Sequence, residues 1–159
     1  MAWTRREFLA RTGLGMGAVA AAWPAMALSA PEAGENLVMP AQLAERLRRH
    51  ERMLILQVGF ATLYRAAHIP GSEYAGPASK TKGLAALRRR LGRARRDRAV
   101  VLYCGCCPWR KCPNIHPAAA AARQLGWRRI ELLYLPDSFA QDWVRAGYPA
   151  AGRDFPTPA

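Results

Sequence analysis

The chain of 159 residues has few acidic side chains and no long apolar stretch beyond its first residues. It contains 11 Asp and Glu residues against 24 Lys and Arg residues, so its formal net charge is +13 at pH 7. No segment after residue 27 is long and apolar enough to span a bilayer, which takes roughly 20 apolar residues. The sequence also lacks internal repeats and low-complexity blocks. A membrane-spanning mature domain and a repeat architecture are therefore both excluded.

Cysteine is absent from the chain except in one short loop. All four cysteines lie within residues 104–112. A structural disulfide framework joins distant segments, because closing a long loop restrains the unfolded chain most. The spacing excludes such a framework here and leaves only a local bridge open, such as one between Cys107 and Cys112.

The first 27 residues are predicted to form a removable export signal. Residues 4–9 form a twin-arginine pattern, residues 14–22 are a short apolar segment, and residues 25–27 have small side chains at a cleavage spacing. An uncleaved membrane anchor is the alternative, but the apolar segment is too short to span a bilayer well. We therefore expect the twin-arginine translocase as a partner, a periplasmic location and no stable membrane insertion after cleavage.

The basic charge has two interpretations. Residues 1–27 contribute +2 of the net charge, and residues 28–159 keep +11. Seven arginines lie between residues 88 and 98. They either attract small anions or an acidic partner, or they form the solvated face of a helix in an arginine-rich chain. Nucleic acid is not an expected partner, because export separates the protein from it.

Apolar periodicity predicts an α/β domain over residues 37–150, after a linker at 28–36 and before an irregular tail at 151–159. Aliphatic runs of strand length occupy residues 53–58, 99–103 and 130–135. Helical patterns occupy residues 42–50, 83–95, 118–125 and 138–145, and Gly126 is predicted to end the third of them. This alternation predicts a central parallel sheet flanked by helices.

The loop over residues 104–113 is predicted to carry the chemistry. It reads Cys-Gly-Cys-Cys-Pro-Trp-Arg-Lys-Cys-Pro and connects the strand at 99–103 to the helix at 118–125. A thiol between a strand's end and a helix N-terminus meets unpaired backbone N–H groups and the positive end of the helix dipole. This setting favours the thiolate, the form that attacks sulfur or binds metal. Sulfur or metal chemistry is therefore expected here.

Three motifs in residues 37–149 together match the pattern of a known protein family. Residues 68–72, His-Ile-Pro-Gly-Ser, resemble the family's Gly-His-Ile-Pro-Gly-Ala motif without its leading glycine. Residues 100–104 resemble the central strand that delivers the catalytic cysteine. Trp143 with residues 146–149, Ala-Gly-Tyr-Pro, resembles the close of the domain. Together these motifs resemble a rhodanese-type sulfurtransferase domain, and this resemblance implies a three-layer α/β fold.

The resemblance also implies a two-step sulfur transfer with Cys104 as the nucleophile. Cys104 attacks the outer sulfur of a small anionic donor such as thiosulfate, sulfite leaves, and a persulfide remains. A thiol or a protein acceptor then removes the sulfur. The residues expected to bind the donor are Gly105, Cys106, Cys107, Arg110 and Lys111. No cofactor is expected under this interpretation.

The sequence departs from the family pattern at three places. Residues 57–59 are Gln-Val-Gly where the family has Asp-Val-Arg, and residues 136–137 are Pro-Asp where it has Gly-Gly. The active loop is also longer. Its extra cysteines are Cys106, Cys107 and Cys112. They are interpreted either as a sulfur relay or redox set, or, together with Cys104, as a soft-metal site for copper or zinc.

Three other features carry less specific expectations. The same fold acting as a partner-binding domain with a disulfide-bonded loop is a further alternative. His68 is expected to make a structural hydrogen bond, and His116 to belong to the helix start. Trp109 is expected to cover the thiolate or to bind a partner.

Overall fold

The structure is a computed structural model that describes residues 35–155, which lie within one compact unit formed by residues 32–159. The predicted export signal lies outside the described residues. Five parallel strands form one sheet in the order β1-β5-β4-β2-β3. The strands are β1 (Leu37–Val38), β2 (Met53–Gln57), β3 (Glu73–Tyr74), β4 (Ala99–Tyr103) and β5 (Ile130–Leu133). The helical elements are α1 (Pro40–Arg48), α2 (Ala61–Ala66), α3 (Thr81–Gly92), η1 (Trp109–Lys111), α4 (Ile115–Gln124) and η2 (Ala140–Val144).

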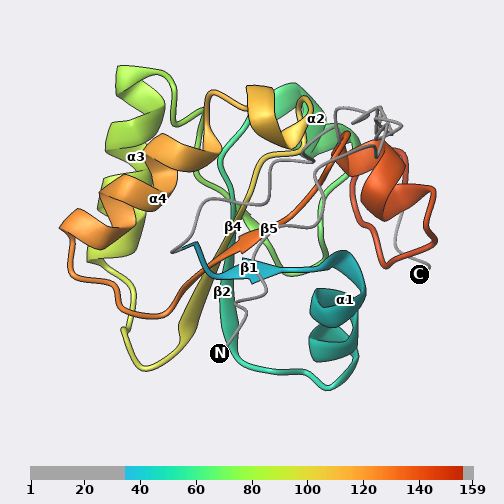
Figure 1. The fold of residues 1–159 in the computed structure, drawn as a ribbon, viewed down its shortest axis with the longest axis horizontal. Helices are drawn as coiled ribbons and strands as arrows, with labels where there is room; N and C mark the ends of the chain where they lie inside the picture. Colours follow the sequence, from blue (N-terminus) through green and yellow to red (C-terminus); the bar gives the residue numbers. More distant parts are fainter. Residues whose placement is uncertain (1–34, 156–159) are drawn as a thin grey trace, which may run out of the picture. The chain divides into compact units, whose positions relative to one another are not determined.

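The sheet lies between two layers of helices, with α3 and α4 on one side and α1 on the other, as Figure 1 shows. One face packs against α3 and α4 through a cluster that includes Leu102 of β4 and Leu87 of α3. The other face packs against α1 and η2 through a cluster that includes Val101 of β4 and Trp143 of η2. Successive residues of a strand point to opposite faces, so an apolar run such as β4 fills both layers. The predicted three-layer α/β architecture is confirmed.

Most predicted elements are present, and the differences have local causes. The strand at β4 has the predicted bounds, and β2 and β5 end one and two residues earlier than predicted. Helix α4 begins at Ile115, three residues before its predicted start. Pro117 is accommodated in its first turn because the N–H groups there have no intrahelical partner. Gly126 follows the C-cap of α4 as predicted, and its N–H donates to the carbonyl of Arg123.

The turn at residues 68–72 is fastened to β4 by a buried tyrosine. The hydroxyl oxygen of Tyr103 accepts a hydrogen bond from the Ile69 N–H at 3.2 Å and lies 3.0 Å from Ser72 Oγ. His68 makes the structural contact expected of it, with Nδ1 2.7 Å from the carbonyl oxygen of Tyr64. The turn is therefore part of the scaffold beneath the carboxyl end of the sheet.

Residues 151–155 are attached to this turn, since the backbone groups of Ala151 and His68 exchange two hydrogen bonds. Within residues 35–155, no helix has the length and apolar character needed to cross a membrane.

Candidate functional site

Cys104 follows directly on the central strand β4 and points toward the layer of α3 and α4. Alternation places Val100, Leu102 and Cys104 on the same face of the sheet, and all three belong to the cluster packed against these helices. Gly105 then turns the chain with a φ of +69°. A side chain at position 105 would collide with Phe139. The thiol is therefore held at a fixed point between the sheet and the start of α4.

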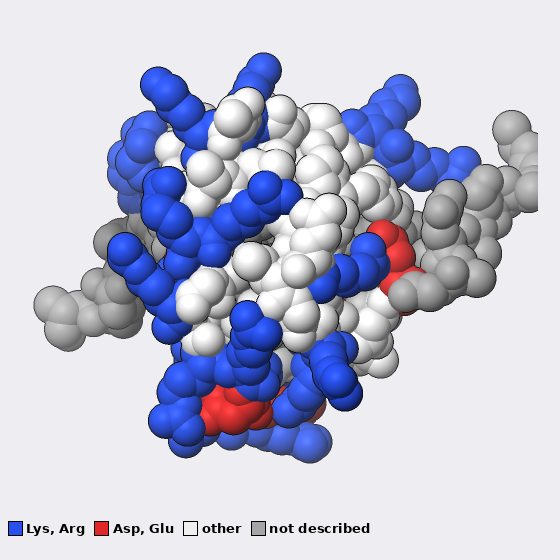
Figure 2. All heavy atoms as spheres, turned by 90° about the vertical axis from the view of Figure 1, so that its left-hand side faces the viewer, with Lys and Arg blue, Asp and Glu red and all other residues white. Residues whose placement is uncertain are grey.

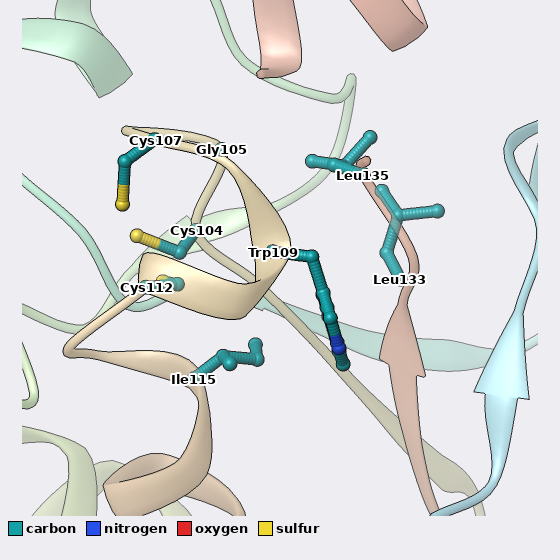
Figure 3. A pocket seen from close by; sticks show the side chains of 8 residues that line it. All are labelled: Cys104, Gly105, Cys107, Trp109, Cys112, Ile115, Leu133 and Leu135. Atoms are coloured by element: carbon teal, nitrogen blue, oxygen red, sulfur yellow. The ribbon is translucent and has the colours of Figure 1, made fainter. Parts of the chain in front are cut away.

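The four thiols form one contiguous cluster, and Figure 3 shows the sulfur atoms of Cys104, Cys107 and Cys112 gathered on one side of the loop. Sγ of Cys104 lies 3.1 Å from Sγ of Cys106, which lies 3.3 Å from Sγ of Cys107. The sulfur atoms of Cys104, Cys106 and Cys112 are all within 4.8 Å of one another. None of the four is in a disulfide. The structure thus brings together every cysteine that the sequence singled out.

Negative charge in the cluster is favoured at Cys112 and not at Cys104. The pKa of the Cys112 thiol is lowered by a hydrogen bond from Cys104, and backbone N–H groups of Asn114 and Ile115 at the start of α4 lower it further. The pKa of the Cys104 thiol is raised by its hydrogen bond to Cys112 and by burial. The expectation that the helix start stabilises a Cys104 thiolate is corrected, because the amides at that end contact Cys112. Desolvation is the main cause that raises the pKa of Cys107, to about 12.

Asn114 is a site residue that the sequence interpretation missed. It is the N-cap residue of α4, but its side chain makes no capping hydrogen bond. Its Oδ1 accepts a hydrogen bond from the Ser79 N–H at 3.0 Å, and its Nδ2 donates to Sγ of Cys104 at 3.4 Å and to Sγ of Cys106 at 3.7 Å. The residue is fully buried. It therefore links the segment before α3 to the thiols.

Gln57 and Gly59, at and just after the end of β2, lie next to Cys104. Nε2 of Gln57 donates to the carbonyl oxygen of Cys104 at 3.4 Å, and its Oε1 accepts from the Gly59 N–H at 3.2 Å. A Cβ atom at position 59 would lie 2.9 Å from Sγ of Cys104. Residues at two of the positions where the sequence departs from the rhodanese pattern therefore contact Cys104 directly.

The cluster is nearly closed to solvent. Cys104 is 4% exposed and Cys112 is 8% exposed, whereas Cys106 and Cys107 are half-buried. A cavity of about 10 Å³ touches Cys104, Cys107 and Cys112 and is closed by Trp109 and by Leu133 and Leu135 (Figure 3). This volume holds about one water molecule.

Cys104 also lines a separate cleft of about 320 Å³, on the side of Phe139 and Val144. Trp109 stands over the first space with its ring 5.3 Å from that of Tyr134. In Figure 3 the ring extends toward Leu133 and away from the three sulfur atoms, so neither of the two roles expected of Trp109 is confirmed.

The predicted basic residues of the loop lie on its exposed side. Arg110 and Lys111 form η1 with Trp109, and both are exposed. Further exposed basic residues on α3 and α4 extend this charge, and Figure 2 shows Lys and Arg side chains spread over the face that these helices present. Some of this charge is neutralised locally, as in the ion pair of Arg90 with Glu73. The surroundings of the loop therefore have an excess of positive charge.

Three thiols have the spacing of a possible metal site. Zinc–sulfur bonds of about 2.3 Å in a tetrahedron place ligand sulfur atoms about 3.8 Å apart. The separations among Cys104, Cys106 and Cys112 lie close to this value, from 3.1 Å up to at most 4.8 Å. His116 is not in this group, and its Nδ1 lies 3.2 Å from Oε1 of Glu35. The expectation that His116 belongs to the helix start agrees with its position in the first turn of α4.

Comparison with solved structures decides the fold. The solution structure of a rhodanese-like domain from Anabaena sp. superposes with a TM-score of 0.59 at 21% identity, covering 79% of this chain and 87% of that one. A protein from Bacillus halodurans gives the same TM-score at 20% identity, covering 76% and 79%. The chain has the rhodanese-like fold. No family model matches the sequence, and no curated protein matches it.

A further rhodanese-like neighbour has an activity in its name. The thiosulfate sulfurtransferase from Pseudomonas aeruginosa matches with a TM-score of 0.53 and 24% identity, over 76% of this chain and 20% of that one. At such identities the likeness establishes the shared fold. The activity of this domain depends on the residues of its own site.

Proposed function

We propose that this rhodanese-like domain is a sulfurtransferase that takes sulfane sulfur from a small anionic donor onto Cys104. The observation that carries the proposal is the position of Cys104 at the end of the central strand, in hydrogen-bond contact with a second thiol that carries the negative charge. A solved neighbour of the same fold is named a thiosulfate sulfurtransferase. Thiosulfate is therefore the first donor to test.

The Cys104–Cys112 pair supplies the nucleophile. Cys112 holds the charge of the singly deprotonated pair, and Cys104 holds the proton. When Cys104 attacks the outer sulfur of thiosulfate, its proton passes to Cys112 and a sulfur–sulfur bond forms on Cys104. The bond between the two sulfur atoms of the donor breaks, and its electron pair leaves with sulfite. The Cys112 thiolate, which is hydrogen-bonded to the Cys104 thiol, is thus the base that takes its proton.

The surroundings of the pair support a persulfide. A small cavity of about 10 Å³ adjoins Cys104, Cys107 and Cys112. Asn114 Nδ2 donates a hydrogen bond to Cys104 Sγ, so it can stabilise negative charge there. The basic side of the loop and of α3 and α4 attracts a dianionic donor. Cys106 and Cys107 are half-buried, so they form the more accessible side of the cluster for that donor.

Sulfite release from thiosulfate tests the proposal. Fully reduced protein is mixed with one equivalent of thiosulfate without any added thiol, and sulfite is measured over time. We expect one sulfite per protein in the wild type and none in Cys104→Ala. Circular dichroism checks that the variant is folded, since every cysteine lies in the loop and the chain offers no matched cysteine elsewhere. Wild-type protein that releases no sulfite would refute the activity, and undiminished release by Cys104→Ala would move the nucleophile to another thiol.

A soft-metal site is a second candidate function. It is favoured by the three sulfur atoms of Cys104, Cys106 and Cys112 within 4.8 Å of one another, because clustered thiolates bind Cu(I) and zinc. The experiment titrates Cu(I) or Zn²⁺ into reduced protein under anaerobic conditions against a competing chelator. One tightly bound ion per chain, lost in Cys112→Ser, would support this function. Binding no tighter than that of Cys112→Ser would exclude it.

The site of action is proposed from the sequence. The twin-arginine pattern at residues 4–9 favours export to the periplasm, where the acceptor is a thiol or a protein. N-terminal sequencing of the protein recovered from the periplasm tests this, with cleavage expected after residue 27. Recovery only from the cytoplasm with Met1 retained would refute the proposed export.

A further inference from the structure

The crowding of the thiols sets a limit on the lifetime of a persulfide at this site. A persulfide on Cys104 has two further thiols, Cys106 and Cys112, with their sulfur atoms within 4.8 Å of its own. Disulfides form when a thiolate attacks a sulfur atom that carries a leaving group. A persulfide is such a sulfur pair, and its outer atom leaves as sulfide. The persulfide and its resolving thiol are therefore already in contact in the folded domain.

We propose that this domain releases the transferred sulfur as sulfide, with Cys112 as the resolving thiol that forms a disulfide with Cys104. The inference rests on the proposed function, because it begins from the Cys104 persulfide. It assigns Cys112 a second role after it has accepted the Cys104 proton. The outcome is reduction of sulfane sulfur, in place of its delivery intact to an acceptor.

The contacts of Cys112 favour it over Cys106 as the resolving thiol. Cys112 Sγ accepts hydrogen bonds from the backbone N–H groups of Asn114 and Ile115, which hold it beside Cys104. A Cys104–Cys106 bridge would instead close a ring through Gly105 alone, where the backbone has a φ of +69° and packs against Phe139. Cys112 approaches from the far end of the loop, so its bridge closes a longer segment that contains η1.

The step balances with the electrons of the two cysteines. The singly deprotonated pair and thiosulfate give the Cys104–Cys112 disulfide, one hydrosulfide ion and one sulfite ion. The sulfur–sulfur bond of the donor breaks first, and the bond between Cys104 and the transferred sulfur breaks second. The two thiols are oxidised, and the transferred sulfur is reduced to sulfide. A dithiol reductant is required only to return the disulfide to two thiols for the next turnover.

A single-turnover experiment tests the inference. Reduced protein receives one equivalent of thiosulfate in the absence of external thiol, and sulfite, sulfide, free thiols and intact mass are measured at completion. We expect one sulfite, one sulfide and two lost thiols per protein, with a mass lower by two hydrogen atoms. Dithiothreitol should then restore both thiols and a second turnover. Sulfite without sulfide, with one sulfur atom added to the protein, would overturn the inference and leave the proposed function standing.

Two variants identify the resolving thiol. In Cys112→Ser, sulfite release is expected to be slower, but the sulfur should stay on the protein and be recovered as sulfide only after dithiothreitol is added. Cys106→Ser is tested in parallel, and sulfur trapped in that variant alone would overturn the assignment to Cys112. Absence of sulfite in the wild type would refute the proposed function itself, so the two failures are distinguishable.

Discussion

The ionisation of the thiols depends on a neutral hydrogen-bond donor, the side chain of Asn114. Its Nδ2 donates to the sulfur atoms of Cys104 and Cys106. In Asn114→Asp the side chain keeps its size but exchanges this donor for an acceptor with negative charge. Like charges disfavour ionisation, so we expect the rate of thiol alkylation at pH 7 to fall roughly tenfold, since a pKa higher by one unit gives that change in thiolate. Reaction with iodoacetamide, followed by mass spectrometry, measures it.

The matched control for Asn114→Asp is Gln124→Glu at the exposed opposite end of α4. It makes the same amide-to-acid change about 15 Å away along the helix. Its alkylation rate should stay close to that of the wild type. A similar decrease in both variants would show that the effect comes from net charge and not from the contact with the thiols.

Gly105 carries both a backbone and a packing constraint. Its φ is +69°, and a Cβ atom there would collide with Phe139. Gly71 has a similar φ of +74° and open space around it. We expect Gly71→Ala to lower the free energy of unfolding by about 1 kcal/mol through its backbone strain. Gly105→Ala should lower it by at least about 2 kcal/mol more through overpacking, measured by urea denaturation. Equal effects would refute the packing constraint.

These residues also show the limits of sequence reasoning at this scale. The position of Cys104 at the end of a strand was predictable because it follows an apolar run whose length and composition predict a buried strand. The sulfur contacts of Asn114 and the carbonyl contact of Gln57 were not, because each joins segments more than ten residues apart or depends on a loop conformation. An Asn before a helix predicts a cap, and only the packed structure shows that its side chain turns to the thiols instead.

The start of α4 helps to determine which thiol ionises first, together with the hydrogen bond from Cys104. The pKa of Cys112 is lowered to about 6 by its hydrogen bond from Cys104 and by two amides of α4. Because this pKa is lowered, the thiolate is present above it and is lost as the pH falls through about 6. We expect one thiolate to appear between about pH 5 and pH 7 in reduced protein. Its ultraviolet absorbance measures it, and the rate of sulfite release should rise over the same range.

Cys112→Ser should abolish this titration, whereas Cys107→Ser should retain it, because burial raises the pKa of Cys107. A thiolate that still forms near pH 6 without Cys112 would show that the helix amides serve another sulfur atom.

The elements themselves differ in how far they were predictable. Strands β2, β4 and β5 are aliphatic runs buried on both faces, and such runs stand out in a sequence. Strands β1 and β3 have two residues each, too few for any periodicity to appear. Helix α4 begins three residues before the alanine-rich run that predicted it, since Pro117 is tolerated in its first turn.

At the scale of the whole molecule, the net charge of +13 predicts a salt-dependent reaction with an anionic donor. Salt screens charges separated by more than about 10 Å at 0.1 M. We expect the second-order rate of sulfite release from thiosulfate to fall roughly threefold between about 0.02 M and 0.2 M salt. A rate independent of salt would show that donor capture does not use this charge.

Two paired variants locate the charge that matters. Arg88→Gln with Arg89→Gln removes exposed charge from α3, on the face shown in Figure 2, and Arg48→Gln with Arg49→Gln removes the same charge at the end of α1, on the other side of the sheet. The α3 pair should lower the rate at low salt more than the α1 pair. Equal decreases would assign the effect to net charge alone.

The confinement of every cysteine to nine consecutive positions has a mechanical consequence. The cysteines cannot cross-link α1, α3 or η2 to the sheet, so packing and hydrogen bonds hold these elements in place without disulfides. Oxidation and reduction then act on the segment from Cys104 to Cys112, between β4 and α4. Every other helix and strand keeps the same covalent connections in both redox states.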